Sequence, residues 1–103
     1  MAALNLTARA LDDLERLVEF LLDSDSVAAT ETERLIMEAL DILRRHPLIG
    51  RPVESGLREL VISRGASGYL ALYSVEESDD AIMVLAIRHQ REVGFADDQG
   101  GQP

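Results

Sequence analysis

The sequence predicts a single α+β domain in which a helical hairpin packs on a mostly antiparallel four-stranded sheet, in the order β-α-α-β-β-β. Three observations predict this fold. Apolar residues recur at helical spacing through residues 7–45, and the period becomes strand-like from residue 57. The turns between the last three strands are short enough to make neighbouring strands antiparallel. With 103 residues, the chain has the length for one core.

The first elements are a short strand and an amphipathic helix. Residues 2–6 are mostly apolar, which suits a strand, and Thr7 can cap the helix that follows. The apolar stripe of this helix consists of Leu11, Leu14, Leu17, Val18, Leu21 and Leu22. We expect its opposite face to carry Asp12, Asp13, Arg16 and Glu19.

A second helix follows the polar turn at residues 23–26. Its apolar stripe consists of Ala28, Leu35, Ile36, Ala39, Leu40 and Leu43. Pro47 disfavours helical geometry at His46, so we expect this helix to end near Arg45. Two amphipathic helices joined by a short turn should form an antiparallel hairpin.

Three strands are expected at residues 57–62, 69–75 and 81–87, with turns at 65–68 and 76–80. Residues 82–87 are apolar on both faces, which indicates a central strand. Residues 96–103 are polar and contain turn-forming residues, so we expect a disordered tail after a domain that spans residues 1–95.

The composition excludes several classes of site. The chain has no cysteine, which excludes disulfides and cysteine–zinc sites, and every basic residue is arginine, so no lysine can act as a base or Schiff-base former. No apolar run reaches the roughly 18–20 residues of a membrane span, and the first residues do not resemble a signal peptide. We expect a cytoplasmic protein with no metal or nucleotide cofactor, because the sequence has neither a glycine-rich phosphate loop nor a clustered ligand set.

Charge is segregated along the chain. The formal net charge is −9, yet residues 1–43 carry ten acidic residues and three arginines, whereas residues 44–91 carry six and seven. The net charge repels free nucleic acid at long range, so we expect no direct sequence-specific nucleic-acid binding. A local arginine-bearing surface can still form on this acidic molecule.

Five segments, taken in order, resemble one family. They are Ala10-Leu11-Asp12-Asp13-Leu14, Leu43 with Pro47-Leu48-Ile49-Gly50-Arg51-Pro52, Leu57-Arg58-Glu59-Leu60, Tyr69 to Tyr73, and Ile87-Arg88-His89-Gln90-Arg91-Glu92. Between about residue 4 and residue 95 the chain resembles the RelE/ParE toxins of bacterial type II toxin–antitoxin systems. The resemblance implies a toxin that a cognate antitoxin neutralises.

The superfamily contains two activities, ribosome-dependent mRNA cleavage and inhibition of DNA gyrase. For the nuclease branch, the resemblance implies an arginine in a Tyr-Arg-x-x-Tyr-like segment and a tyrosine near the end of the last strand. This sequence has Leu70 and Phe95 at those positions, and neither side chain can stabilise a phosphate or transfer a proton. The net charge also opposes docking on ribosomal RNA, so we favour the ParE-like branch.

Candidates for chemistry are Arg88, His89 and Arg91, which cluster at the end of the last strand. Strand alternation places Arg88 on one face and His89 with Arg91 on the other. If the protein is a nuclease, His89 is the general acid or base and Arg91 stabilises the phosphate. In the structural interpretation, His89 caps the strand and the arginines pair with acidic residues.

Candidates for partner binding are Arg51, Arg58, Tyr69, Tyr73 and Arg88. Arg51 and Arg58 could contact carboxylates of an antitoxin or target, or could form salt bridges within the fold. Tyr69 and Tyr73 share one face of their strand, where they could anchor an antitoxin segment or fill the core.

Taken together, these features favour a growth-inhibiting toxin, of the kind used in plasmid stabilisation, that binds DNA gyrase without chemistry of its own. Its expected partners are gyrase and a cognate antitoxin, with no membrane, and it could form a homodimer or a hetero-oligomer with the antitoxin. The first alternative is a ribosome-dependent mRNA endonuclease, and the second is a non-toxic module that binds an antitoxin.

Overall fold

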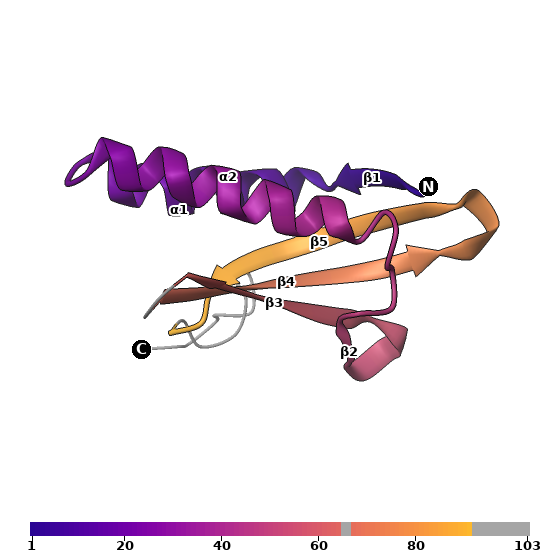
Figure 1. Ribbon diagram of the computed structural model, residues 1–103. Helices are drawn as coiled ribbons and strands as arrows, with labels where there is room; N and C mark the ends of the chain where they lie inside the picture. Colours follow the sequence, from indigo (N-terminus) through magenta and orange to yellow (C-terminus); the bar gives the residue numbers. More distant parts are fainter. Residues whose placement is uncertain (65–66, 92–103) are drawn as a thin grey trace.

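The computed structural model describes residues 1–64 and 67–91, in which two helices lie along one face of a five-stranded sheet (Figure 1). Strand β1 (Ala3–Leu6) leads into helices α1 (Ala8–Leu22) and α2 (Ser26–Ile42). The remaining strands are β2 (Arg51–Pro52), β3 (Arg58–Arg64), β4 (Ser67–Glu76) and β5 (Ala81–His89). Their spatial order is β1-β5-β4-β3-β2, in which only the β1–β5 pair is parallel.

The predicted α+β class and the order of the predicted elements are confirmed, but the prediction of four strands is wrong. The fifth strand, β2, has two residues, and Arg51 and Pro52 pair with Glu59 and Arg58. Proline cannot donate a backbone hydrogen bond, and here it occupies the edge of the sheet, where that loss is tolerated. Central strand β5 lies between β1 and β4, as its apolar faces predict.

Both helices begin at side-chain caps. The Thr7 hydroxyl oxygen accepts a hydrogen bond from the Ala10 N–H at 3.1 Å, and the Asp25 carboxylate accepts one from the Ala28 N–H at 3.0 Å. Each cap satisfies a backbone donor that the first helical turn leaves without a partner.

Helix α2 ends at Ile42, three residues before the predicted end at Arg45. The N–H groups of residues 43–45 donate to the carbonyls three positions earlier, at 3.0 to 3.1 Å, which tightens the chain into a turn. Ser67 and Gly68, which were expected in a turn at 65–68, belong to β4, and residues 65–66 lie outside the described residues. The expected domain end at residue 95 and the expected tail at 96–103 lie outside the described residues.

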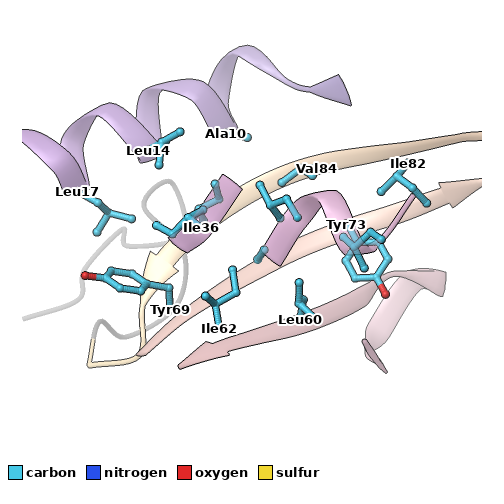
Figure 2. Close-up of a cluster of buried hydrophobic side chains, with 14 of the residues drawn as sticks. Ala10, Leu14, Leu17, Ile36, Leu60, Ile62, Tyr69, Tyr73, Ile82 and Val84 are labelled. Atoms are coloured by element: carbon cyan, nitrogen blue, oxygen red, sulfur yellow. The ribbon is translucent and has the colours of Figure 1, made fainter. Parts of the chain in front are cut away.

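The core lies between the helices and the sheet (Figure 2). Ile36, Leu40 and Leu43 from the second helix and the turn after it are fully buried. The side chains that meet them from the sheet are Leu60, Ile62, Tyr69, Ala71, Tyr73, Ile82, Val84 and Ile87. Across the described part of the chain, no helix is long and apolar enough to cross a membrane.

Candidate functional site

A bulge in β5 sets the direction of the side chains near the end of this strand. Tyr73 pairs with Val84 and Leu72 pairs with Ala86, so Leu85 has no partner residue on β4. The extra residue shifts the alternation, and Val84 and Ile87 both belong to the core cluster although three positions separate them. His89, two residues beyond Ile87, therefore lies on the helix-covered face.

Thr7, which caps α1, and Asp13 within α1 provide hydrogen-bond partners for the backbone of β5 beyond the end of β1. Strand β1 pairs with β5 only as far as Leu6 with Val84. Beyond that point, the Thr7 hydroxyl donates to the Leu85 carbonyl at 3.2 Å, and the Asp13 carboxylate accepts from the Ile87 N–H at 2.9 Å. A buried backbone donor without a partner is costly, so these contacts fix α1 against the end of β5.

Asp13 lies on the buried face of α1, not on the opposite face as the sequence analysis expected. Its exposed fraction is 3%, and its carboxylate lies 3.8 Å from the guanidinium groups of both Arg9 and Arg16. The signal was present in the sequence, because Asp13 is three residues after Ala10 and four before Leu17, which are both buried. Its charge led to the wrong assignment.

A pocket that we call the main pocket lies between the C-terminal half of α1 and the ends of β4 and β5. Its volume is about 610 Å³, and its lining is mostly apolar. The lining residues are Arg16, Leu17, Phe20, Leu21, Tyr69, His89 and Arg91. The rings of Tyr69 and His89 meet edge to face, with centroids 5.2 Å apart and an angle of 86°. Phe20 is 79% exposed, an unusual position for a large aromatic side chain.

His89 is held by the chain that follows it. Its Nδ1 accepts a hydrogen bond from the Arg91 N–H at 3.0 Å. A nitrogen that accepts a hydrogen bond carries no proton, so the neutral ring carries its proton on Nε2. Nδ1 is therefore occupied within the chain, and it would have to lose this hydrogen bond before it could accept a proton from a substrate.

Arg88 does not line the pocket with His89 and Arg91, although its Nη1 donates to the His89 carbonyl at 3.4 Å. It pairs in register with Leu70 of β4, so the two residues are neighbours on the sheet. His89 and Arg91 both line the pocket with Arg16. Of the three predicted candidates for chemistry, the structure thus brings two together and adds Arg16, which the sequence analysis had not selected.

A second set of candidates holds the loop of residues 46–50, which connects α2 to β2 (Figure 1). The Tyr73 hydroxyl donates to the Pro47 carbonyl at 2.7 Å and accepts from the Gly50 N–H at 2.9 Å. Arg58 donates from Nη1 to the carbonyls of Leu48 and Gly50, at 3.1 and 2.7 Å. We call Tyr73 and Arg58 the loop clamp.

Gly50 is required by the closeness of this contact. A Cβ atom at this position would lie 2.6 Å from the Tyr73 hydroxyl oxygen and 2.9 Å from the Glu59 carbonyl oxygen. Burial raises the pKa of the Tyr73 hydroxyl, although the hydrogen bond from Gly50 and the positive charge of Arg58 act in the opposite direction. Tyr73 is fully buried and is not part of the surface.

Arg51 forms an ion pair within the sheet. Its Nε and Nη2 atoms lie 3.0 and 2.5 Å from one carboxylate oxygen of Glu59. The Glu59 side chain is 7% exposed, whereas that of Arg51 is 68% exposed. The guanidinium group therefore neutralises a buried carboxylate and remains accessible from solvent.

The predicted residues thus form two groups at different ends of the sheet. Tyr69 lies below Leu17 of α1, while Tyr73 lies towards the other end of β4, near Ile82 (Figure 2). Asp13, Arg16, Phe20 and Gly50 were missed, and only Asp13 had a clear signal in the sequence. Within residues 1–64 and 67–91, no group of three histidine, aspartate or glutamate side chains is placed to hold a metal ion.

Comparisons with known proteins agree on the family. Residues 4–94 match the model of the ParE toxin of the type II toxin–antitoxin system parDE. Toxin RelE3 of Caulobacter vibrioides is 36% identical over 92 residues, which is 89% of this chain and 98% of that toxin. Toxin RelE1 of the same organism is 37% identical over 86 residues, or 84% of this chain and 90% of that toxin.

Solved structures show the same fold. The chromosomal ParDE system from P. aeruginosa contains a chain that superposes with a TM-score of 0.72 at 25% identity, covering 86% of this chain and 96% of that one. A metal-bound toxin from Helicobacter pylori superposes with a TM-score of 0.53 at 12% identity, covering 91% and 100%, which shows the fold alone. The chain belongs to the ParE family of type II toxin–antitoxin toxins, within the wider group that includes RelE.

Proposed function

We propose that this toxin inhibits DNA gyrase by binding it, without cleaving a substrate, and that a cognate antitoxin neutralises it. The observation that carries the proposal is the chemistry of the main pocket. Its lining is mostly apolar, and the Nδ1 atom of its histidine already accepts a hydrogen bond from the Arg91 N–H. Such a surface suits a protein contact better than the transfer of a proton from a ribose hydroxyl.

The position of Leu70 supports the same choice. The resemblance implies an arginine there in the nuclease branch, but the leucine is 6% exposed and cannot stabilise a phosphate. Its neighbour on the sheet, Arg88, therefore has no second cation beside it at that position. A phosphoryl transition state spreads negative charge over several oxygens, and its stabilisation needs several preorganised donors.

The alternative, a ribosome-dependent mRNA endonuclease, has one observation in its favour. His89, Arg91 and Arg16 line the same pocket, which is a histidine with two guanidinium groups. The two similar curated toxins are also named RelE. In this mechanism, His89 would have to lose its hydrogen bond from the Arg91 N–H before Nδ1 could accept a proton.

Two assays on the purified full chain separate these functions. The first measures supercoiling of relaxed plasmid by purified gyrase, and the second measures cleavage of mRNA on programmed ribosomes. We expect lower supercoiling and intact mRNA. Cleavage that disappears in His89→Ala would refute the proposal in favour of the nuclease, and inactivity in both assays, with antitoxin binding retained, would favour the non-toxic module.

We also propose that the antitoxin contacts the main pocket through an acidic amphipathic segment, because Arg16 and Arg91 accompany apolar walls. Four of the predicted partner-binding residues remain proposed partner contacts: Arg51, which is exposed, Tyr69, which lines the pocket, Arg58 and Arg88. Phe20→Ser should weaken antitoxin binding about tenfold or more in calorimetry, as expected for an aromatic hot spot. Leu22→Ser is the matched control, because Leu22 is 49% exposed and does not line the pocket. Equal affinity of both variants would place the antitoxin elsewhere.

A further inference from the structure

The face of the sheet opposite the two helices carries an apolar surface (Figure 1). Strand register arranges its side chains in two rows across β3, β4 and β5: Val61 with Leu70 and Arg88, and Glu59 with Leu72 and Ala86. Ala71 lies between these rows on β4 and belongs to the core under the helices, so strand alternation directs both rows to the opposite side. We call these residues the outer face.

Two residues of the outer face are buried, although α1 and α2 lie on the other side of the sheet. Leu70 is 6% exposed and Ala86 is 0% exposed, whereas Val61, in the same row as Leu70, is 49% exposed. Neighbouring strands shield a side chain from the sides, and a layer above the sheet shields it from the direction in which it points. A layer over β4 and β5 that leaves Val61 at its edge accounts for this difference.

The chain continues beyond β5 from a point beside the outer face. The Gln90 N–H donates to the Gly68 carbonyl at 2.9 Å, which extends the β4–β5 ladder past His89. Leu70 pairs with Arg88, two residues before Gln90, so a segment that turns back after Gln90 reaches Leu70 within about 7 Å along the strand. Residues 92–103 follow the last described residue and are long enough to do so.

Residues 92–98 have the composition that such a layer needs. Three of them are apolar and three are acidic: Val93, Phe95 and Ala96, and Glu92, Asp97 and Asp98. On the outer face, Glu59 forms its ion pair with Arg51, and Arg88 supplies a further positive charge. A partly apolar, acidic segment is complementary to an apolar surface that carries this arginine.

We propose that residues 92–98 fold back over the outer face, with the Phe95 ring against Leu70 and Leu72. The main pocket is the other surface within reach, but Phe20 in its lining is 79% exposed, whereas Leu70 is 6% exposed. Arg88 is a proposed partner contact on the covered surface. A partner that contacts Arg88 must therefore displace this segment first, and the inference holds for gyrase and for the ribosome alike.

Cysteine pairs in the full chain test this contact without background, because the natural sequence has no cysteine. The test pair is Val61→Cys/Ala96→Cys, which joins the edge of the outer face to the segment and leaves Phe95 in place. Phe20→Cys/Ala96→Cys probes the main pocket instead. Val27→Cys/Ala96→Cys measures random encounters, since Val27 is 65% exposed at the start of α2.

The readout is the intramolecular disulfide formed in a glutathione buffer at low protein concentration, measured by mass spectrometry. The effective concentration of the test pair should exceed that of the Val27 pair about tenfold or more. Adding Phe95→Ser to the test pair should lower this value to that of the Val27 pair, whereas the matched control Gln99→Ser should leave it unchanged. Val61, Phe20 and Val27 are all exposed, so circular dichroism should show unchanged folding.

Three results would overturn the proposal. The first is a test pair that forms its disulfide no more readily than the Val27 pair, and the second is a Phe20 pair that exceeds the test pair, which would place the segment in the main pocket. The third is an effective concentration that Phe95→Ser does not change, because the ring would then not anchor the segment.

Discussion

Replacement of Tyr73 by phenylalanine isolates the hydroxyl group that joins the sheet to the 46–50 loop. The ring remains, so no cavity forms in the core. Without the hydroxyl, the Gly50 N–H loses its acceptor and the Pro47 carbonyl loses its donor. The contact with Gly50 is buried, and an unsatisfied buried donor costs about 1–3 kcal/mol. That is a large part of the roughly 5–15 kcal/mol by which small domains are stable.

Urea unfolding followed by circular dichroism measures this loss. The free energy of unfolding should fall by about 1–3 kcal/mol with an unchanged denaturant slope, because the folded structure buries the same surface. Tyr69→Phe is the control, since the described residues offer the Tyr69 hydroxyl no hydrogen-bond partner. A loss for Tyr73→Phe no greater than that for Tyr69→Phe would refute the assignment of the loop clamp.

Three further predictions concern the same contacts. Gly50→Ala should destabilise the fold by about 1–3 kcal/mol, because the added methyl group overpacks against Tyr73. The thermal midpoint should fall by about 4–8 °C per kcal/mol. An unchanged midpoint would mean that the loop adjusts freely. Burial raises the pKa of the Tyr73 hydroxyl above the ordinary value of 10.0. Its contribution to the free energy of unfolding should therefore be fully present below about pH 10 and be lost as the pH rises through the folded-state pKa. In Tyr73→Phe, the free energy of unfolding should fall less steeply over this range. Asp13→Leu should destabilise the fold by about 1–3 kcal/mol and speed hydrogen exchange at the Ile87 amide. Asp13→Asn keeps an acceptor oxygen and should protect that amide. Equal exchange in both variants would contradict the hydrogen bond between Asp13 and the Ile87 N–H.

The parts of the fold that depend on periodicity were predictable. Leucine stripes and the Thr7 cap identify the first helix, and the change of period identifies the later strands. The two residues of β2 have no period, and their pairing depends on β3 approaching from elsewhere in the chain. Pro47 limits how far α2 can extend, but the tightened turn that ends the helix at Ile42 depends on local packing that the sequence does not display.

The site was less predictable, because tertiary partners define it. Residues 82–87 are apolar on both faces, so their pattern could not reveal the bulge at Leu85 that places His89 beside Tyr69. The partners of Arg58 are backbone carbonyls, which every residue carries, so no side-chain motif could identify the loop clamp. A sheet surface occupied by tyrosine and arginine therefore gave the same signal for a binding role and for a structural one.

That ambiguity determines how mutations of this toxin should be interpreted. Arg58 is a proposed partner contact, yet it also donates to two carbonyls of the loop that presents Leu48 and Ile49. Loss of toxicity in Arg58→Ala would therefore have two sources, a missing guanidinium contact and a displaced loop. Leu48→Ser removes the exposed side chain and leaves the backbone hydrogen bonds in place. If Arg58→Ala and Leu48→Ser reduce binding of the same partner, Arg58 acts by positioning the loop; if only Arg58→Ala does so, its guanidinium group contacts that partner directly.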